Sequence, residues 1–502
     1  MDRAVNLERV RTRMEPWDIV VIGGGATGAG CALDAASRGY DVLLLEQHDL
    51  SKGTSSRSTK LIHGGIRYLR QGNISLVRES LRERGTLLRN APHVVHELAF
   101  VVPCYSLLQK LYYGAGLKIY DLLAGKYRLG RSRMLSKRET IGLLPTINEV
   151  RLAGGVLYYD CQFDDARFLI DLAQAADRRG AAILNYARVT GISNDRTSRL
   201  NIVSFETSET NETIEVRARA VINATGAFAD DVRSISDEAA EPVIAFSQGI
   251  HLVFDGKFLP GETAIMIPKT SDGRLLFCIP WHGCTLVGTT DTPVERATLE
   301  PEALDSEIEF VLETAGKYLA AQPTRDDILS VFAGIRSLVK SRPDAKTSSL
   351  SRSHELFVDA NGMVTITGGK WTTYRRMAED AVDKAIETGR LTERPCVTET
   401  LDIPGPREVP VGAPIHPELP YTVDNVVTAV RDEMAQTVED ILARRTRALF
   451  INAGAALEAA ASVAALIANE TSRSGYDAEK DVAEFKKVAA KYRSGDSDRR
   501  GD

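Results

Sequence analysis

The sequence predicts an α/β fold with a parallel sheet, because its first fifty residues alternate strand, helix and strand. The β-branched run DIVVI, residues 18–22, is typical of a buried parallel strand. GGGATGAG and an alanine-rich helical pattern follow, and the pattern ends at Arg38 and Gly39, a cation and a glycine of the kind that terminates helices. A second strand, DVLLLE, ends at Glu46. Together these elements make a βαβ unit, the building block of a Rossmann-type domain.

The turn after the first strand has the spacing G-x-G-x-x-G at Gly23, Gly25 and Gly28. Glycines at these positions permit a tight turn and let backbone N–H groups approach a pyrophosphate at the helix N-terminus. Glu46, at the end of the second strand, is placed to accept a hydrogen bond from a ribose hydroxyl. A glycine-rich turn with only a packing role is the alternative, but the strand–turn–helix–strand context favours dinucleotide binding.

Further segments favour FAD over a nicotinamide cofactor. Small hydroxyl donors, Thr54, Ser55 and Ser56, follow the second strand. AVINATG, residues 220–226, reads as a strand that ends in a small turn, and TITGGKWTTYR, residues 365–375, as a further strand–turn–helix passage. Widely separated segments that converge on one nucleotide indicate a large cofactor in an extended pose. FAD fits this better than a nicotinamide cofactor that must come and go, and no motif indicates a covalent flavin.

Composition excludes several classes of protein. With 502 residues the chain is long enough for two or three domains, and its formal net charge of −6 argues against a nucleic-acid partner. The six cysteines are scattered without a CxxC pair, which favours a reduced, cytosolic setting. The charged N-terminus has no apolar core typical of a signal peptide, and no run of about 18 uninterrupted apolar residues occurs. Alanine-rich AGAALEAAASVAALIA, from Ala453, is expected to be a packed helix of a small domain.

The motifs resemble those of the FAD-dependent glycerol-3-phosphate dehydrogenases, within the D-amino-acid-oxidase-like group of flavoproteins. In order along the chain they are VIGGGATGAG, GTSSRSTKLIHGGIRYL, FDDARFLIDLA, VINATG, LVGTTDT, FAGIRSLV and TGGKWTTYRRMAED. EMAQTVEDILARRTRALF, residues 433–450, is similar to the helical C-terminal domain of the family. KLIHGGIRYL and GGKWTTYR are much more specific than the glycine fingerprint. The chain departs from the family at Ser337, where proline is common, and in a shorter stretch after Thr398.

The resemblance implies hydride transfer from C2 of sn-glycerol 3-phosphate to FAD, giving dihydroxyacetone phosphate, with the electrons passed on to a quinone. This chemistry needs cations for the phosphate dianion and a positioned base for the C2 hydroxyl proton. By resemblance His251 is the base, and Lys370 either steadies charge on the reduced flavin or is itself the base when neutral. A surface charge and a satisfied core histidine are the alternatives for these residue types. The implied substrate contacts are Arg67, Tyr68, Arg336 and, as a weaker phosphate candidate, Arg352.

Other positions in these motifs are expected to contact the cofactor. The predicted set is Gly23, Gly25, Gly28, Glu46, Thr54, Ser55, Ser56, Lys60, Leu61, His63, Ala224, Thr225, Gly226, Gly369, Lys370 and Thr372. His63 is interpreted as a flavin-pocket residue and not as the base. No metal is expected, because the histidines and carboxylates lack ligand spacing. FDDAR, residues 163–167, is interpreted as a helix N-cap with acids in the first turn.

The cofactor domain is expected to be discontinuous, formed by residues 15–90, 150–235 and 330–388. Residues 91–149 and 236–329 would form a β-rich substrate domain, whose strand-like runs HLVF, RLLFCIPW and CTLVGTTD suit a sheet over the active site. Residues 400–493 are expected to form a helical domain. The last segment, residues 494–502, is expected to be a disordered tail.

One basic segment contrasts with the acidic total. KYRLGRSRMLSKR, residues 126–138, has six cations and no acid, and it follows the apolar-aromatic LLQKLYYGAGLKIYDLL. Such a pair can lie at an anionic membrane surface, where each cation contributes about 1 kcal/mol. A solvated loop or a cationic wall that attracts a phosphate substrate is the alternative. Because the family resemblance implies a membrane quinone, we expect a cytoplasmic enzyme attached peripherally to the inner face of the cell membrane; a homodimer is also allowed.

Other functions fit part of this pattern. The same substrate could be oxidised with oxygen as the acceptor, since residue types do not determine access to a reduced flavin. Related oxidation of hydroxy acids or amines is a further enzyme class, because an arginine pair binds carboxylates as well as phosphates. A non-enzymatic flavoprotein is disfavoured by the presence of Arg67, His251, Arg336 and Lys370 together.

Overall fold

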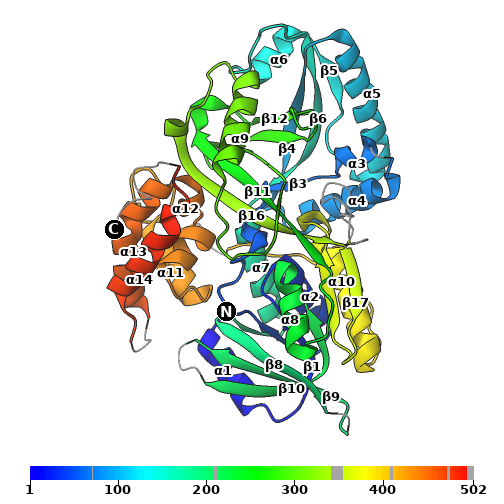
Figure 1. Cartoon of the computed structure of the whole chain (residues 1–502), viewed down its shortest axis with the longest axis vertical. Helices are drawn as coiled ribbons and strands as arrows, with labels where there is room; N and C mark the ends of the chain where they lie inside the picture. Colours follow the sequence, from blue (N-terminus) through cyan, green and yellow to red (C-terminus); the bar gives the residue numbers. More distant parts are fainter. Residues whose placement is uncertain are drawn as a thin grey trace.

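The computed structural model describes residues 1–70, 72–195, 197–208, 212–340, 354–406, 411–471 and 475–494. Two β-sheets lie at opposite ends of the longest axis, and a group of helices at the C-terminal end of the chain packs beside them (Figure 1). This arrangement confirms the predicted α/β class with a β-rich second region and a helical C-terminal domain. The expected tail from residue 495 onward lies outside the described residues.

The first sheet contains the predicted βαβ unit. Its strands follow the order β17-β18-β10-β1-β2-β7, and β9 joins β10 to β8. Their bounds are β1 (Trp17–Ile22), β2 (Val42–Leu45), β7 (Ala182–Leu184), β8 (Ala187–Asp195), β9 (Leu200–Thr207), β10 (Thr213–Asn223), β17 (His354–Val358) and β18 (Val364–Gly368). The helices around it are α1 (Arg3–Thr12), α2 (Ala26–Ser37), α7 (Asp165–Asp177), α8 (Ala229–Ser236) and α10 (Tyr374–Gly389). Side chains of β1, α2, α7 and α10 share one apolar core, as expected for a parallel strand covered by helices.

Three turns meet at one edge of this sheet. In the parallel register Ile22 lies opposite Leu45 and Asn223, and Asn223 lies opposite Thr365. Because the carboxyl ends of parallel strands share an edge, the turns that follow β1, β10 and β18 lie together. The predicted convergence of the three glycine-containing segments is therefore confirmed.

The second sheet is formed from both halves of the chain. Its order is β15-β11-β14-β13-β12-β4-β6-β3, with β16 on β11 and β5 on β6. Its strands are β3 (Leu61–Ile62), β4 (Val95–Cys104), β5 (Arg133–Leu135), β6 (Gly154–Phe163), β11 (Ile244–Asp255), β12 (Thr263–Ile267), β13 (Leu276–Trp281), β14 (Cys284–Gly288), β15 (Thr292–Val294) and β16 (Ile328–Val339). The strand-like runs expected over the site are β11, β13 and β14 of this sheet.

Two predicted domain boundaries are wrong. Boundaries at residues 150 and 330 placed β6 and β16 with the first sheet, whereas β6 pairs with β4 and β16 pairs with β11. The reason is that both are apolar strands whose composition fits either sheet, and only the long antiparallel pairings distinguish the two. The structure therefore moves the flavin-domain boundaries past these strands.

Helices flank the second sheet and make up the C-terminal part. Beside the sheet lie α3 (Ile66–Arg70), α4 (Ile74–Asn90), α5 (Leu107–Ala124), α6 (Lys137–Leu143) and α9 (Asp305–Tyr318). The helical domain comprises α11 (Val423–Asp432), the π-helical turn η9 (Asp440–Arg445), α12 (Ala448–Ile451), α13 (Ala453–Glu470) and α14 (Ala478–Ala490). Short 3₁₀ turns are η1 (Thr54–Ser56), η2 (Gly125–Tyr127), η3 (Gly226–Phe228), η4 (Gly256–Phe258), η5 (Arg325–Asp327), η7 (Trp371–Thr373) and η8 (Thr398–Thr400).

The alanine-rich segment from Ala453 is α13, and its inner face is buried against the rest of the helical domain, which confirms the predicted packed helix. Within the described residues, no helix combines the length and the apolar character needed to cross a membrane.

Candidate active site

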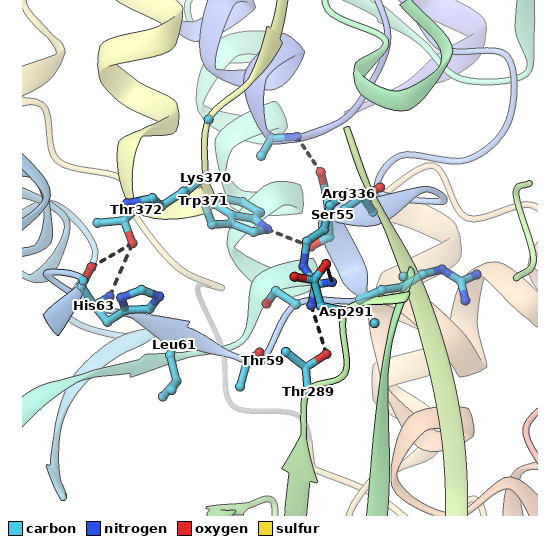
Figure 2. A pocket seen from close by; sticks show the side chains of 18 of the residues that line it. Ser55, Thr59, Leu61, His63, Thr289, Asp291, Arg336, Lys370, Trp371 and Thr372 are labelled. Carbon is cyan, nitrogen blue, oxygen red and sulfur yellow. Dashed lines mark hydrogen bonds and ion pairs between the residues drawn. The ribbon is translucent and has the colours of Figure 1, made fainter. Parts of the chain in front are cut away.

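A cavity of about 350 Å³ lies between the two sheets. Its walls come from the loop 54–68, from β11 and β16, from residues 289–291 and from residues 368–377. Figure 2 shows Lys370, Trp371 and Thr372 beside His63 on one side, with Arg336, Thr289 and Asp291 on the other. Segments that are hundreds of residues apart in the chain therefore present polar side chains to one space.

The glycine turn is packed too tightly for side chains at two of its three glycines. Gly23 has φ +107°, and a Cβ there would lie 2.8 Å from the carbonyl oxygen of Ala224. A Cβ on Gly28 would lie 1.8 Å from the carbonyl oxygen of Gly23, because α2 packs directly on the turn. Gly25 is the N-cap of α2, and a Cβ there would lie 3.2 Å from Ser55 Oγ. The first and third glycines thus have packing roles, while the second lies at the helix N-terminus where a phosphate would bind.

Glu46 closes this turn from the end of β2. Its carboxylate accepts hydrogen bonds from the backbone N–H of Gly24 at 2.6 Å and of His48 at 2.8 Å. Burial raises the pKa of Glu46, and these two hydrogen bonds oppose the shift. The carboxylate therefore stands beside the glycine turn, where a ribose hydroxyl would reach its remaining lone pairs.

The hydroxyl run after β2 is held in place by hydrogen bonds to other segments. Ser55 Oγ accepts from the backbone N–H of Ala26 at 2.9 Å, and the Ser55 carbonyl accepts from Trp371 Nε1 at 2.8 Å (Figure 2). Thr54 donates to the carbonyl of Ile335 at 2.6 Å. These bonds tie the loop to α2, η7 and β16, so the loop links both sheets at the cavity.

His251 lines the cavity from β11 and is only 2% exposed. Its Nε2 is 2.9 Å from Thr59 Oγ1, and its ring stacks on Phe332 with centroids 4.9 Å apart. Burial, assisted by the positive charges of Lys60 and Arg336, holds the pKa of His251 well below its usual range. The imidazole is therefore neutral at neutral pH, the form in which it can accept a proton.

Arg336 lies on β16 beside this histidine. Its guanidinium donates to Thr289 Oγ1 and to the carbonyl of Thr290, both at 3.0 Å, and lies 3.7 Å from an Asp291 carboxylate oxygen. A Cβ on Gly249 would lie 2.3 Å from the guanidinium, so the bare backbone of β11 makes room for it. The side chain is 25% exposed, which leaves part of this buttressed cation facing the cavity.

Lys370 and Thr372 form the opposite wall. Lys370 Nζ lies 4.0 Å from the ring centroid of Tyr68, a cation–π contact. The His63 N–H donates to Thr372 Oγ1 at 3.3 Å, and the same hydroxyl lies 3.4 Å from the His63 carbonyl. The turn after β18 is thereby fixed to the loop after β3.

Most predicted residues meet at this site. The cavity is lined by Thr54, Ser55, Leu61, His63, Tyr68, Gly226, His251, Arg336, Gly369, Lys370 and Thr372. Gly23, Gly25, Gly28, Glu46, Ala224 and Thr225 lie at the adjoining turns of the first sheet. Arg67 is the second residue of α3, but its side chain lies outside the described part of the structure, and Arg352 lies outside it altogether.

The side chains of two residues in the predicted cofactor set do not line the cavity. Lys60 points away from the cavity and is fully buried, with its Nζ 2.7 Å from an Asp165 carboxylate oxygen. Ser56 is also buried and does not line the cavity. They were predicted from their neighbours in the motif, and the sequence does not show that the loop directs these two side chains into the interior.

Other cavity residues were not predicted. Thr289, Thr290 and Asp291 hold Arg336, and Arg274, Asp160 and Trp371 also line the cavity. Thr289, Thr290 and Asp291 belong to the motif LVGTTDT, which carries the family resemblance but did not by itself indicate a contact with Arg336.

The residues present fit an FAD cofactor. The N-terminus of α2, beginning with Ala26 and Thr27, opens into the same cavity as Lys370 and His251. Gly368 and Gly369 have φ +78° and +70°, so the turn after β18 presents backbone without side chains. One end of the cavity, at the N-terminus of α2, thus suits the phosphates of an elongated cofactor, and the other end lies beside the candidate base His251.

Comparisons with known proteins agree with this geometry. A family model described as FAD dependent oxidoreductase matches residues 18–375, and a model of the C-terminal domain of alpha-glycerophosphate oxidase matches residues 395–478. The chain is 36% identical over 530 residues to the mitochondrial glycerol-3-phosphate dehydrogenase of Homo sapiens, an alignment that covers 94% of this chain and 73% of the human protein. The chain belongs to the FAD-dependent glycerol-3-phosphate dehydrogenase family. FAD is accordingly its cofactor.

Further similar proteins extend the comparison. The mitochondrial glycerol-3-phosphate dehydrogenase of Arabidopsis thaliana is 44% identical over 407 residues, and the match covers 78% of this chain but 64% of the plant protein. The solved glycerol-3-phosphate dehydrogenase of Bacillus halodurans, complexed with FAD, superposes with a TM-score of 0.76 at 26% identity, covering 98% of this chain and 97% of that one. An FAD-bound L-alpha-glycerophosphate oxidase from Mycoplasma pneumoniae shares the fold, with a TM-score of 0.57 at 19% identity and coverage of 78% and 100%.

Proposed function

We propose that this flavoprotein oxidises sn-glycerol 3-phosphate to dihydroxyacetone phosphate and passes the electrons to a quinone. The observation that carries the proposal is that Arg336 and His251 contact two consecutive residues, Gly288 and Thr289, at the end of β14. Arg336 donates to Thr289, while His251 packs on Gly288, where a Cβ would lie 2.3 Å from the ring. An anion-binding cation and a neutral base thus face the same small space.

His251 takes the proton in this proposal. As the C2–H bond breaks, the C2 hydroxyl proton passes to the imidazole and the C2–O bond becomes a carbonyl. Bound FAD supplies the acceptor for the hydride that leaves C2. Neutrality of His251 matters because a protonated imidazole has no lone pair for the hydroxyl proton.

Arg336 binds the phosphate in this proposal, since a guanidinium matches phosphate oxygens with two parallel donors. Its bonds to Thr289 and Thr290 restrict the side chain before substrate arrives, which lowers the entropy lost on binding. By family resemblance we assign Arg67, Tyr68 and Arg352 to the same substrate. Lys370 is assigned to the developing charge on the flavin, with a role as base as the alternative.

Anaerobic titration of the purified yellow protein with glycerol 3-phosphate tests the proposal. Bleaching of the flavin absorbance, reversed rapidly by a quinone analogue and only slowly by oxygen, is the expected result. Rapid reversal by oxygen would replace the quinone by oxygen as acceptor. An absence of bleaching with FAD bound would overturn the substrate.

We also propose peripheral attachment to an anionic membrane at the inner face of the cell membrane. The support is α5, whose outer face exposes large apolar side chains: Leu107, Leu108, Leu111, Tyr112, Ile119 and Leu122. The basic segment 126–138 follows directly, and its Lys126, Arg128 and Arg131 are exposed or partly exposed. Apolar side chains beside cations suit the boundary between headgroups and acyl chains, where a quinone is also reached. A homodimer stays a prediction.

A further inference from the structure

The loop that carries Thr59 is held from the interior by one carboxylate. Asp165 is fully buried, and its Oδ2 accepts from the Ser58 N–H at 3.0 Å, the Ser58 hydroxyl at 2.7 Å and Lys60 Nζ at 2.7 Å. Both neighbours of Thr59 are therefore bound to the same oxygen atom. Lys60 also donates to the carbonyl of Ser56 at 2.8 Å, which closes the loop on itself.

The helical domain contributes a cation to this cluster. Arg447 is 1% exposed and donates to the Ser56 carbonyl at 2.6 Å, and its guanidinium lies 3.4 Å from the other oxygen of Asp165. The guanidinium also lies 3.9 Å from the ring centroid of Phe450 in the same domain. Arg447 thereby joins three parts of the chain: the loop, the start of α7 and α12.

The cluster reaches the candidate base through Thr59. Thr59 Oγ1 is 2.9 Å from His251 Nε2, and the His251 ring stacks on the ring of Phe332. Lys60 Nζ lies 5.0 Å from the centroid of that same phenylalanine ring. The imidazole is thus fixed by a hydrogen bond with the loop and by a ring that packs on the buried cation.

We propose that Asp165 and Arg447 are positioning residues that hold Thr59 against His251, so that the helical domain completes the active site. The assignment rests on the proposed function, in which His251 accepts the substrate proton. Neither residue lines the cavity, and both act through the loop.

Two further features favour positioning over a purely stabilising role. Lys60 and Arg447 have φ +62° and +64°, a backbone region that residues with side chains seldom adopt, and such strain concentrates at functional sites. Buried ion pairs add little stability compared with apolar packing, because both charges lose their hydration. What the cluster does provide is a fixed loop geometry.

The test uses holoenzyme variants and a matched control. Thr59→Val replaces the hydroxyl by a methyl group of similar size, and Arg447→Lys keeps the charge but loses the fork that reaches both Ser56 and Asp165. Arg445→Lys is the control, because Arg445 is equally buried in the same segment but binds Asp49 and the carbonyl of Glu433. We expect each of the first two to slow anaerobic flavin reduction roughly tenfold to hundredfold at unchanged FAD content, as expected for a displaced catalytic group.

Coupling separates positioning from general damage. The double variant Thr59→Val/Arg447→Lys is expected to be no slower than the slower single variant, because both changes disrupt the same contact, the one between Thr59 and His251. Arg445→Lys is expected to stay within about twofold of the parent rate and to combine multiplicatively with Thr59→Val. A multiplicative effect in Thr59→Val/Arg447→Lys, or a parent-like rate in Arg447→Lys, would overturn the proposal.

A second readout keeps the inference independent of the substrate. In histidine-labelled holoenzyme, the imidazole NMR signal that disappears in His251→Gln is expected to shift in Thr59→Val and Arg447→Lys but not in Arg445→Lys. If glycerol 3-phosphate fails to bleach the parent enzyme while these shifts occur, the proposed substrate is wrong but the positioning role is supported. If the parent is bleached but the His251 signal does not shift in Arg447→Lys, only the positioning role is overturned.

Discussion

Gly288 lies directly against the imidazole of His251: a Cβ on this glycine would come within 2.3 Å of the ring Cδ2. The two residues are opposite each other on the paired strands β11 and β14, so neither backbone can withdraw easily. His251 therefore holds its orientation partly because its neighbour has no side chain. The contact is a steric counterpart to the hydrogen bond between His251 and Thr59.

Gly288→Ala is expected to rotate the imidazole away from its position and slow flavin reduction by roughly tenfold to hundredfold. FAD content should be unchanged, because Gly288 does not touch the glycine turn. Stopped-flow reduction by glycerol 3-phosphate measures the rate. Gly191→Ala in β8 is the control, since its Cβ would meet Ser204 at an ordinary 3.5 Å; equal rates in both variants would contradict the steric argument.

Arg336→Ala is expected to weaken substrate binding while FAD stays bound. Loss of a charge-assisted bond to phosphate costs about 1.5–3 kcal/mol, which corresponds to roughly 10–150-fold in affinity. Titration of the reduction rate against substrate concentration gives the apparent affinity. Arg325→Ala removes an arginine just before β16 whose ion pairs are with Glu309 and Asp305, and it should leave the affinity unchanged. An unchanged substrate midpoint in Arg336→Ala would remove Arg336 from the substrate site.

The pKa of His251 predicts how stability depends on pH. The folded pKa is held below the ordinary 6.5, chiefly by burial, so the unfolded chain binds the extra proton first as the pH falls. This contribution to stability is complete above about pH 6.5 and is lost below it, with a slope of up to about 1.4 kcal/mol per pH unit. Denaturant unfolding between pH 5 and 7 measures the slope. His251→Gln should flatten it, and an identical slope in the variant would show that other groups cause the loss.

Gly25→Val is expected to eliminate bound flavin. A valine side chain at the N-cap of α2 would stand between the backbone N–H groups and a pyrophosphate, and its Cβ already meets Ser55 Oγ at 3.2 Å. The flavin absorbance of the purified protein gives the FAD content. Gly53→Val is a matched control because Gly53 has the same φ of −83° and nothing within 4 Å of its Cβ. Retention of full FAD by Gly25→Val would refute the phosphate role of this turn.

The parts of the site that follow from local rules could be predicted from the sequence. The turns after β1, β10 and β18 converge because parallel neighbours end at one edge, a rule that needs only three strand–glycine patterns. FDDAR was expected to start a helix, and Asp164 does cap α7 by accepting from the Arg167 N–H at 3.0 Å. Periodicity and capping chemistry are encoded within a few residues, which is why these predictions are confirmed.

Long-range partnerships could not be predicted in the same way. Asp165 pairs with Lys60 across 105 residues, and the sequence around either residue does not indicate the other as its partner. The assignment of β6 and β16 to the wrong sheet has the same cause, because strand composition does not specify a partner. The bond from the Ala26 N–H to Ser55 Oγ was not predicted either, because it joins residues from two separate segments of the chain.

The exposed apolar face of α5 leads to a prediction about membrane binding. Leu108 and Leu122 are 79% and 78% exposed, and each would bury its side chain at a membrane surface for about 1.5–3 kcal/mol. Leu108→Glu/Leu122→Glu should therefore reduce co-flotation with anionic liposomes at low salt by more than tenfold, since the carboxylates also repel the headgroups. Val150→Glu/Val411→Glu is the control, because these valines are 70% and 73% exposed but lie outside α5. Flavin content and reduction rate should be equal in all three proteins. Parent protein that remains with the soluble fraction, or equal flotation of the two double variants, would show that α5 does not bind the membrane.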